Sequence, residues 1–119
     1  MFSSVARATI VAFVITTPSL TIATAGTPYD GAWSLSIVTE RGTCEPAYRF
    51  GVQIVDGAVT GPGNLSGRVS SAGLVTVLVA AGDKRASGSG KLSQTSGHGR
   101  WTGGAGDEHC SGSWTAQRS

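Results

Sequence analysis

The sequence has few of the side chains that catalysis and metal binding use most often. His98 and His109 are the only histidines, and Asp107 and Glu108 form the only acidic cluster beside one of them. A zinc site uses three or four such groups. The nucleophile elbow G-x-S-x-G is also absent. We therefore expect no catalytic residues, no metal and no cofactor, and we predict that the protein is not an enzyme.

Charge is sparse as well. Charged residues make up 13% of the chain, and its formal net charge is +2. Nucleic-acid binding needs a concentrated basic surface, because phosphate contacts dominate the affinity. The scattered charges predict that nucleic acid is not a partner.

The first residues are typical of an export signal. Arg7 precedes an apolar run over residues 8–15, which is too short to span a bilayer, and Pro18 follows. Ala23-Thr24-Ala25 matches a peptidase site. We predict a signal peptide over 1–25, cleavage before Gly26, no stable membrane span afterwards, and a secreted or periplasmic protein. The alternative is an uncleaved anchor.

Residues 26–119 contain no apolar stripe with helical spacing. Apolar and polar residues alternate instead, and turn residues recur about every ten positions, which is typical of antiparallel strands. Asp56-Gly57 is the strongest hairpin signal. The sequence predicts a single all-β domain, a meander of about eight strands at 33–39, 48–54, 58–60, 65–70, 74–81, 85–92, 97–103 and 110–117.

The segment at 74–81 and the glycine-rich segments after residue 84 depart from simple alternation. The first, LVTVLVAA, is apolar on both faces, which predicts a strand covered from both sides or one that meets a partner. In the later segments, glycine leaves space that another group can fill.

The three tryptophans are predicted to fill such space. Each follows a glycine by two positions, so the two residues share a face of their strand. A ring lying over a bare glycine of a neighbouring strand suits a tightly curved sheet. We interpret all three as structural aromatics, with sugar stacking as the alternative. The repeated phrases are Gly31-Ala32-Trp33, Gly99-Arg100-Trp101 and Gly112-Ser113-Trp114.

Cys44 and Cys110 are the only cysteines, and export permits a disulfide between them. Cys44 follows the first predicted strand and Cys110 begins the last. In an eight-stranded meander these two strands run antiparallel, so the bridge would join them and remove the exposed edges of the sheet. The sequence predicts a small barrel or a strongly twisted sheet, closed by this one disulfide.

Motifs along the whole region after the leader resemble a family of small exported proteobacterial proteins. The family is loosely labelled as haem-utilisation proteins or exoproteins. The resemblance implies one exported domain, and haem association by label only. It is carried by Asp30-Gly31-Ala32-Trp33, Ile37-Val38-Thr39-Glu40, Cys44, Tyr48-Arg49-Phe50, Ser66-Gly67-Arg68-Val69, Arg85-Ala86-Ser87-Gly88-Ser89-Gly90, Gly99-Arg100-Trp101 and Cys110-Ser111-Gly112-Ser113-Trp114-Thr115.

A second set of residues is similar to the small β-barrel inhibitors of C-type lysozyme. Ala86-Ser87-Gly88, Trp101, Gly103 and Cys110 follow the order found in that family, whereas its tyrosine and double aromatic are missing. The similarity implies an alternative function as an inhibitor of a secreted hydrolase, either lysozyme or a protease.

We expect a non-catalytic binding or structural module whose partner is unknown, such as a secreted protein or an envelope component. Loops are the parts of a closed barrel that specialise most readily. The loops beside the disulfide therefore form a candidate binding rim, with a merely solvated rim as the alternative. If haem binds instead, its axial ligand would be His98, His109, Tyr29 or Tyr48. The rim residues are Arg41, Glu45, Asp107, Glu108 and His109.

Overall fold

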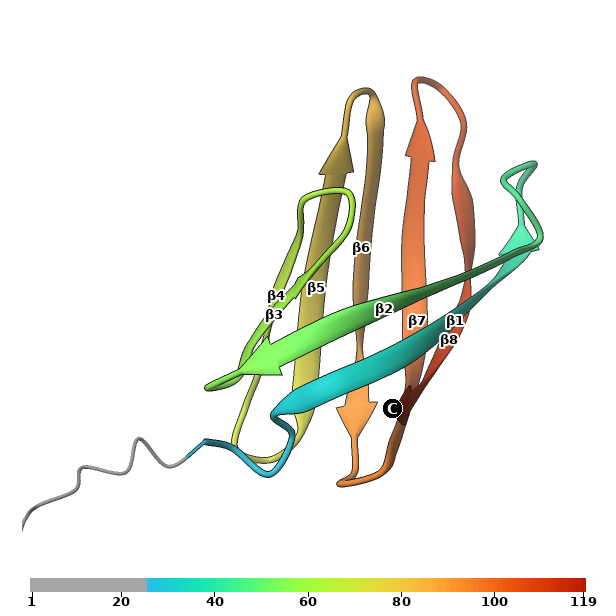
Figure 1. Ribbon diagram of the computed structural model, residues 1–119. Coiled ribbons are helices and arrows are strands. Elements are labelled where there is room, and N and C mark those ends of the chain that lie inside the picture. Colours follow the sequence, from blue (N-terminus) through green and yellow to red (C-terminus); the bar gives the residue numbers. More distant parts are fainter. Residues whose placement is uncertain (1–25) are drawn as a thin grey trace, which may run out of the picture.

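Eight antiparallel strands form a closed meander barrel, which confirms the predicted fold class (Figure 1). The structure, a computed structural model, describes residues 26–119. The predicted signal peptide lies outside the described residues. No helix within them is long and apolar enough to cross a membrane. The strands are β1 (Gly31–Arg41), β2 (Ala47–Val55), β3 (Ala58–Gly61), β4 (Leu65–Val69), β5 (Leu74–Ala81), β6 (Lys84–Leu92), β7 (Ser96–Ala105) and β8 (Cys110–Arg118).

The first and last strands pair with each other, so the sheet is a barrel rather than an open twisted sheet. β1 and β8 lie side by side (Figure 1). Their ladder begins with Trp33 opposite Arg118 and, after a bulge between Thr39 and Arg41, ends with Arg41 opposite Ser111. The predicted disulfide joins Cys44, in the β1–β2 loop, to Cys110 at the start of β8, with the Cα atoms 6.1 Å apart. The bridge therefore fastens the seam at one end of the barrel.

Side chains alternate between the interior and the solvent as the period of two predicts. In β1, Trp33 is 1% exposed and faces the interior with Leu35 and Ile37, whereas Ser34 is exposed. The hairpin between β2 and β3 turns at Asp56 and Gly57, whose φ angles of 51° and 79° belong to a type I′ turn.

The buried core is concentrated in the half of the barrel that lies away from the disulfide. Two tryptophans and a ring of aliphatic side chains fill this half. Apolar residues nearer the disulfide, among them Leu35, Ile37 and Phe50, are only partly buried. The buried set is Trp33, Val52, Ile54, Val59, Leu65, Val69, Val75, Leu92, Trp114 and Ala116.

Inward-facing glycines let Trp114 lie flat against the wall formed by β6 and β7. A Cβ built on Gly90 would lie 2.5 Å from Cζ2 of Trp114, and one on Gly99 would lie 2.6 Å from the same atom. The indole Nε1 of Trp114 donates to the carbonyl of Ser89 at 3.2 Å. The ring therefore occupies the space that the two missing side chains leave.

The expectation that residues 74–81 form a strand covered from both sides is wrong for the described chain. Leu74 and Leu78 on the outer face of β5 are 57% and 64% exposed. A single barrel has one core, inside it, so nothing in residues 26–119 lies over the outer face. The other expectation, that this strand meets a partner, stays a prediction.

Replacing Gly99 by alanine should destabilise the barrel. The new methyl group would overlap the Ser89 carbonyl and the Trp114 ring, and overpacking of this kind costs about 1–3 kcal/mol. Urea unfolding followed by tryptophan fluorescence measures the loss. Gly51→Ala is the matched control, because its Cβ would have only an ordinary contact of 3.6 Å with the Trp33 carbonyl. Equal stability of the two variants would contradict the packing role of Gly99.

Candidate functional site

The half of the barrel that lies next to the disulfide contains an open cavity of about 590 Å³. Its wall is apolar because inward-facing positions of β1, β2 and β5 carry aliphatic and aromatic side chains, while β6 contributes alanine and glycine. Its floor is the buried core, including Trp33 and Trp114. Representative wall residues are Leu35, Ile37, Phe50, Val77, Val79 and Ala86.

Two unequal hairpins widen the mouth on one side. The ladder between β2 and β3 covers only Gln53–Val55, and the ladder between β4 and β5 stops at Leu78. The β3–β4 hairpin is accordingly shorter than the β5–β6 hairpin (Figure 1). Tyr48, from the part of β2 that lies beyond this hairpin, lines the cavity at its mouth and is 41% exposed.

The opposite end of the barrel is sealed by Arg118 and the segment before β1. The Arg118 guanidinium lies 4.7 Å from the ring centroid of Trp33, which is within the range of a cation–π contact. It also donates to the carbonyls of Asp30 and Pro28 at 2.6 Å each, and to that of Gln94 at 2.8 Å. Among residues 26–119, these contacts close this end of the barrel, and the cavity opens toward the disulfide end.

Asp30 holds the same segment against the β2–β3 turn. Its carboxylate accepts from the Thr27 hydroxyl at 2.6 Å, and from the backbone N–H groups of Asp56 at 2.8 Å and Gly57 at 3.2 Å. Because these bonds favour the ionised form, with the Thr27 hydroxyl the largest influence, the pKa of Asp30 lies below its ordinary value.

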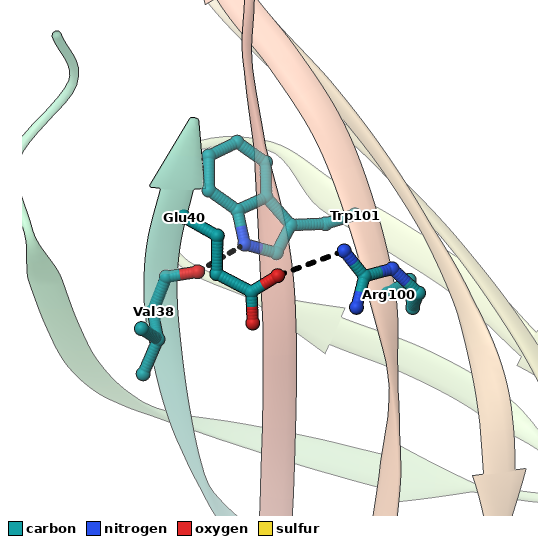
Figure 2. Close-up of polar contacts among 4 residues, drawn as sticks. All are labelled: Val38, Glu40, Arg100 and Trp101. Carbon is teal, nitrogen blue, oxygen red and sulfur yellow. Dashed lines mark hydrogen bonds and ion pairs between the residues drawn. The ribbon is translucent and has the colours of Figure 1, made fainter. Parts of the chain in front are cut away.

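Near the mouth, two contacts join β7 to β1 across the intervening strand β8 (Figure 2). The indole N–H of Trp101 donates to the Val38 carbonyl at 3.0 Å. Arg100 forms an ion pair of 2.9 Å with Glu40, and hydrogen bonds from Arg100 and Ser113 lower the pKa of Glu40. Since neighbouring residues of a strand point to opposite faces, one contact lies inside the barrel and the other outside.

Gly112 makes the inner contact possible. It stands on β8 between Trp101 on β7 and Thr39 on β1, and a Cβ there would collide with the Val38 carbonyl. The bare backbone lets the indole of Trp101 cross β8 and line the cavity. Trp101 is therefore half-buried, whereas Trp33 and Trp114 lie in the core.

The five predicted rim residues are all exposed at the disulfide end. Glu45 and Glu108 line the cavity mouth, whereas Arg41, Asp107 and His109 do not. The carboxylate of Glu108 accepts from the Thr43 hydroxyl and so links the β7–β8 loop to the β1–β2 loop. The binding role of this rim, and the inhibitory function that would use it, stay predictions.

Glu108 also lies close to the disulfide, with Oε1 3.2 Å from the Cys44 sulfur. Ligand atoms of Cys44, Glu108 and Cys110 fall within 4.8 Å of one another, the spacing of a metal site. Both sulfurs are bonded to each other, however, and a metal needs the thiolate form of cysteine. In this cluster the two cysteines form the disulfide that joins the loops at the mouth, and Glu108 lies beside it.

The four residues considered as haem ligands lie in different places. His98 is exposed on the outer side of β7, and His109 is exposed in the β7–β8 loop. Tyr29 packs against the core at the sealed end, with its carbonyl accepting from the Trp33 indole at 2.8 Å. Tyr48 alone among the four lines the cavity. Haem association stays a prediction.

Sequence reasoning missed the cavity itself and two basic residues at its mouth, Lys84 and Arg85. The alternation placed Val77 and Val79 on one face, but alternation does not say whether that face is filled. Lys84, Ala86 and Gly88 follow one another at intervals of two and therefore share a face of their strand. That spacing was a signal that could have placed Lys84 on the inner face.

Comparison with known proteins gives no match for this chain among family models, curated proteins or solved structures. The resemblance to exported proteobacterial proteins stays a prediction.

Replacing Thr27 by alanine should raise the pKa of Asp30 toward its ordinary value of 3.8, because the largest cause of the lowering is removed. A carboxyl whose pKa is lowered on folding stabilises the fold above its ordinary pKa, and that contribution is lost as the pH falls through the lower folded value. The stability difference between wild type and Thr27→Ala should therefore be largest near neutral pH and shrink in acid.

Carbon NMR of the Asp30 carboxyl and urea unfolding at several pH values measure these two effects. Thr27→Ser keeps a hydroxyl and should titrate like the wild type. An unchanged Asp30 titration in Thr27→Ala would contradict the assigned cause.

Proposed function

We propose that the protein is an exported, non-catalytic binding protein that holds one small apolar molecule inside its barrel. The observation that carries the proposal is the cavity of about 590 Å³ with its apolar wall and its opening toward the disulfide end. Its size lies within the range of about 300–1,000 Å³ that is typical of sites for small molecules. The interior of an eight-stranded barrel is either filled by side chains or holds one small ligand.

The energetics of the wall support this proposal. Leu35, Ile37, Phe50, Val77 and Val79 face inward yet are only partly buried. Covering apolar surface stabilises a complex by about 25 cal/mol per Å². The strand ladders fix the distance across the barrel, so the wall cannot collapse to cover these side chains itself. A ligand of matching polarity would cover them.

Export is supported by the disulfide, because such bonds persist in oxidising compartments. It is also supported by the leader-like residues 1–25. Both features favour a protein that binds its ligand outside the cytoplasm.

Filling the cavity should abolish binding of a neutral apolar probe. N-phenyl-1-naphthylamine is suitable because its fluorescence rises in apolar surroundings and it carries no charge. Wild type should bind it with saturable enhancement, and the double variant Val77→Phe with Val79→Phe should not, because both side chains point into the cavity.

The matched control places the same side chains on the outer face of β5, at Thr76→Phe with Leu78→Phe, where both positions are exposed. This variant should bind the probe like the wild type. Thermal unfolding checks that all three proteins are folded. Absence of saturable binding by the wild type, or equal binding by both double variants, would refute the proposal.

The export part has its own test. Intact-mass measurement on protein recovered from the periplasm or the medium of expressing bacteria should give a chain that begins at Gly26 and is two hydrogens lighter than the reduced form. Recovery of the full-length chain from the cytoplasm with two reactive thiols would contradict export while leaving the cavity proposal untouched.

A further inference from the structure

The mouth of the cavity carries a basic residue at an inward-facing position. Lys84 begins β6, opposite Ala81 of β5 and Ala105 of β7, and it shares its face with Ala86 and Gly88. All these neighbours are small and apolar. Lys84 is therefore placed where its ammonium group can stand at the edge of an apolar wall while its methylene stem lies along it.

Nothing in residues 26–119 neutralises this charge. The one ion pair among them joins Arg100 to Glu40 on the outside of the barrel. Arg118 lies inside the barrel at its sealed end, where its guanidinium donates to three carbonyl groups and lies over the Trp33 ring. Lys84 makes no hydrogen bond with another side chain or carbonyl of the described residues, so its donors are open to a ligand.

Two acidic residues also line the mouth. Glu45 belongs to the β1–β2 loop and Glu108 to the β7–β8 loop, and the disulfide holds these two loops together. The Glu108 backbone N–H donates to the carbonyl of Ala105, the residue opposite Lys84, but the Glu108 carboxylate is directed to the disulfide, where it contacts Thr43 and the Cys44 sulfur. Arg85 follows Lys84 in β6 and stands on the opposite, outward face beside Ala80, and Asp83, in the preceding turn, does not line the cavity. Lys84 is therefore the one charged residue of β6 at an inward-facing position of the mouth.

We infer that the ligand is an amphipathic anion, such as a long-chain carboxylate. Its apolar chain occupies the cavity and its anionic group lies at the β6 side of the mouth, against Lys84. This inference rests on the proposed function and adds the chemical class of the ligand. The four residue-to-residue steps from Lys84 to Gly88 span about 13 Å of strand, so an extended alkyl chain reaches from the mouth toward the Trp114 floor.

A neutral chain of the same length would cover the same wall but gain nothing from Lys84. Charge-assisted hydrogen bonds are stronger than neutral ones, but this one is open to water and salt, which limits the gain. We expect a preference of about three- to tenfold for the anion at low ionic strength, and a smaller preference in high salt.

The test compares dodecanoate with dodecanol at neutral pH, each displacing N-phenyl-1-naphthylamine from the full mature protein. Lys84→Met removes the charge and keeps a long apolar stem. Lys91→Met is the matched control, because Lys91 lies on the same strand but is exposed on the outer face near the sealed end, opposite His98 and Leu74. Wild type and Lys91→Met should prefer dodecanoate, and Lys84→Met should bind both ligands equally.

The outcomes separate the two proposals. If neither ligand displaces the probe from wild type, the proposed function fails. If both bind with equal affinity, or if Lys84→Met keeps the preference for dodecanoate, the cavity proposal stands and the anionic head group is refuted. Lys84→Gln is a second variant for the case in which Lys84→Met melts well below the wild type.

Discussion

The pairing of β1 with β8 is the constraint on which the rest of the structure depends. It turns a meander into a barrel, and only a closed wall can enclose an interior. The seam is reinforced at three levels. Arg118 fastens the sealed end, the Trp101 and Arg100 contacts cross β8 nearer the mouth, and Cys44–Cys110 fastens the mouth itself. A strand edge left open here would expose unpaired backbone groups along two strands.

The same seam explains why large and small residues are distributed unevenly. At the sealed end, Trp33 and Trp114 project into the interior, and the second of these needs the bare backbone of Gly90 and Gly99. Toward the mouth, the inward positions of β5 and β6 other than Lys84 are occupied by valine, alanine and glycine. Because a closed ladder holds the wall at a fixed radius, small side chains there leave volume that no neighbour can enter. The cavity is a consequence of wall geometry and residue size together.

Much of the fold could be predicted from the sequence because its determinants are local. Alternation grouped the apolar side chains of β1 and β2 on one face, Asp56-Gly57 marked a hairpin, and the positions of Cys44 and Cys110 indicated closure. The interpretation of residues 74–81 failed because an apolar outward position such as Leu78 has the same local pattern whether solvent or a second layer lies over it. Exposure depends on what lies across space, and alternation carries no such information.

The candidate site was predictable only in part for a related reason. The loops at the disulfide end were identified from the sequence, and Glu45 and Glu108 do lie at the mouth, whereas the cavity and the inward position of Lys84 were not foreseen. The sequence by itself determined which side chains of a strand share a face, because that follows from a period of two along each strand. Only the tertiary structure decided which of the two faces lies inside, how far along the barrel axis each side chain lies, and which side chains it contacts across the interior. Those relations are set by strand register and closure, which bring together residues as distant in sequence as Trp33 and Arg118.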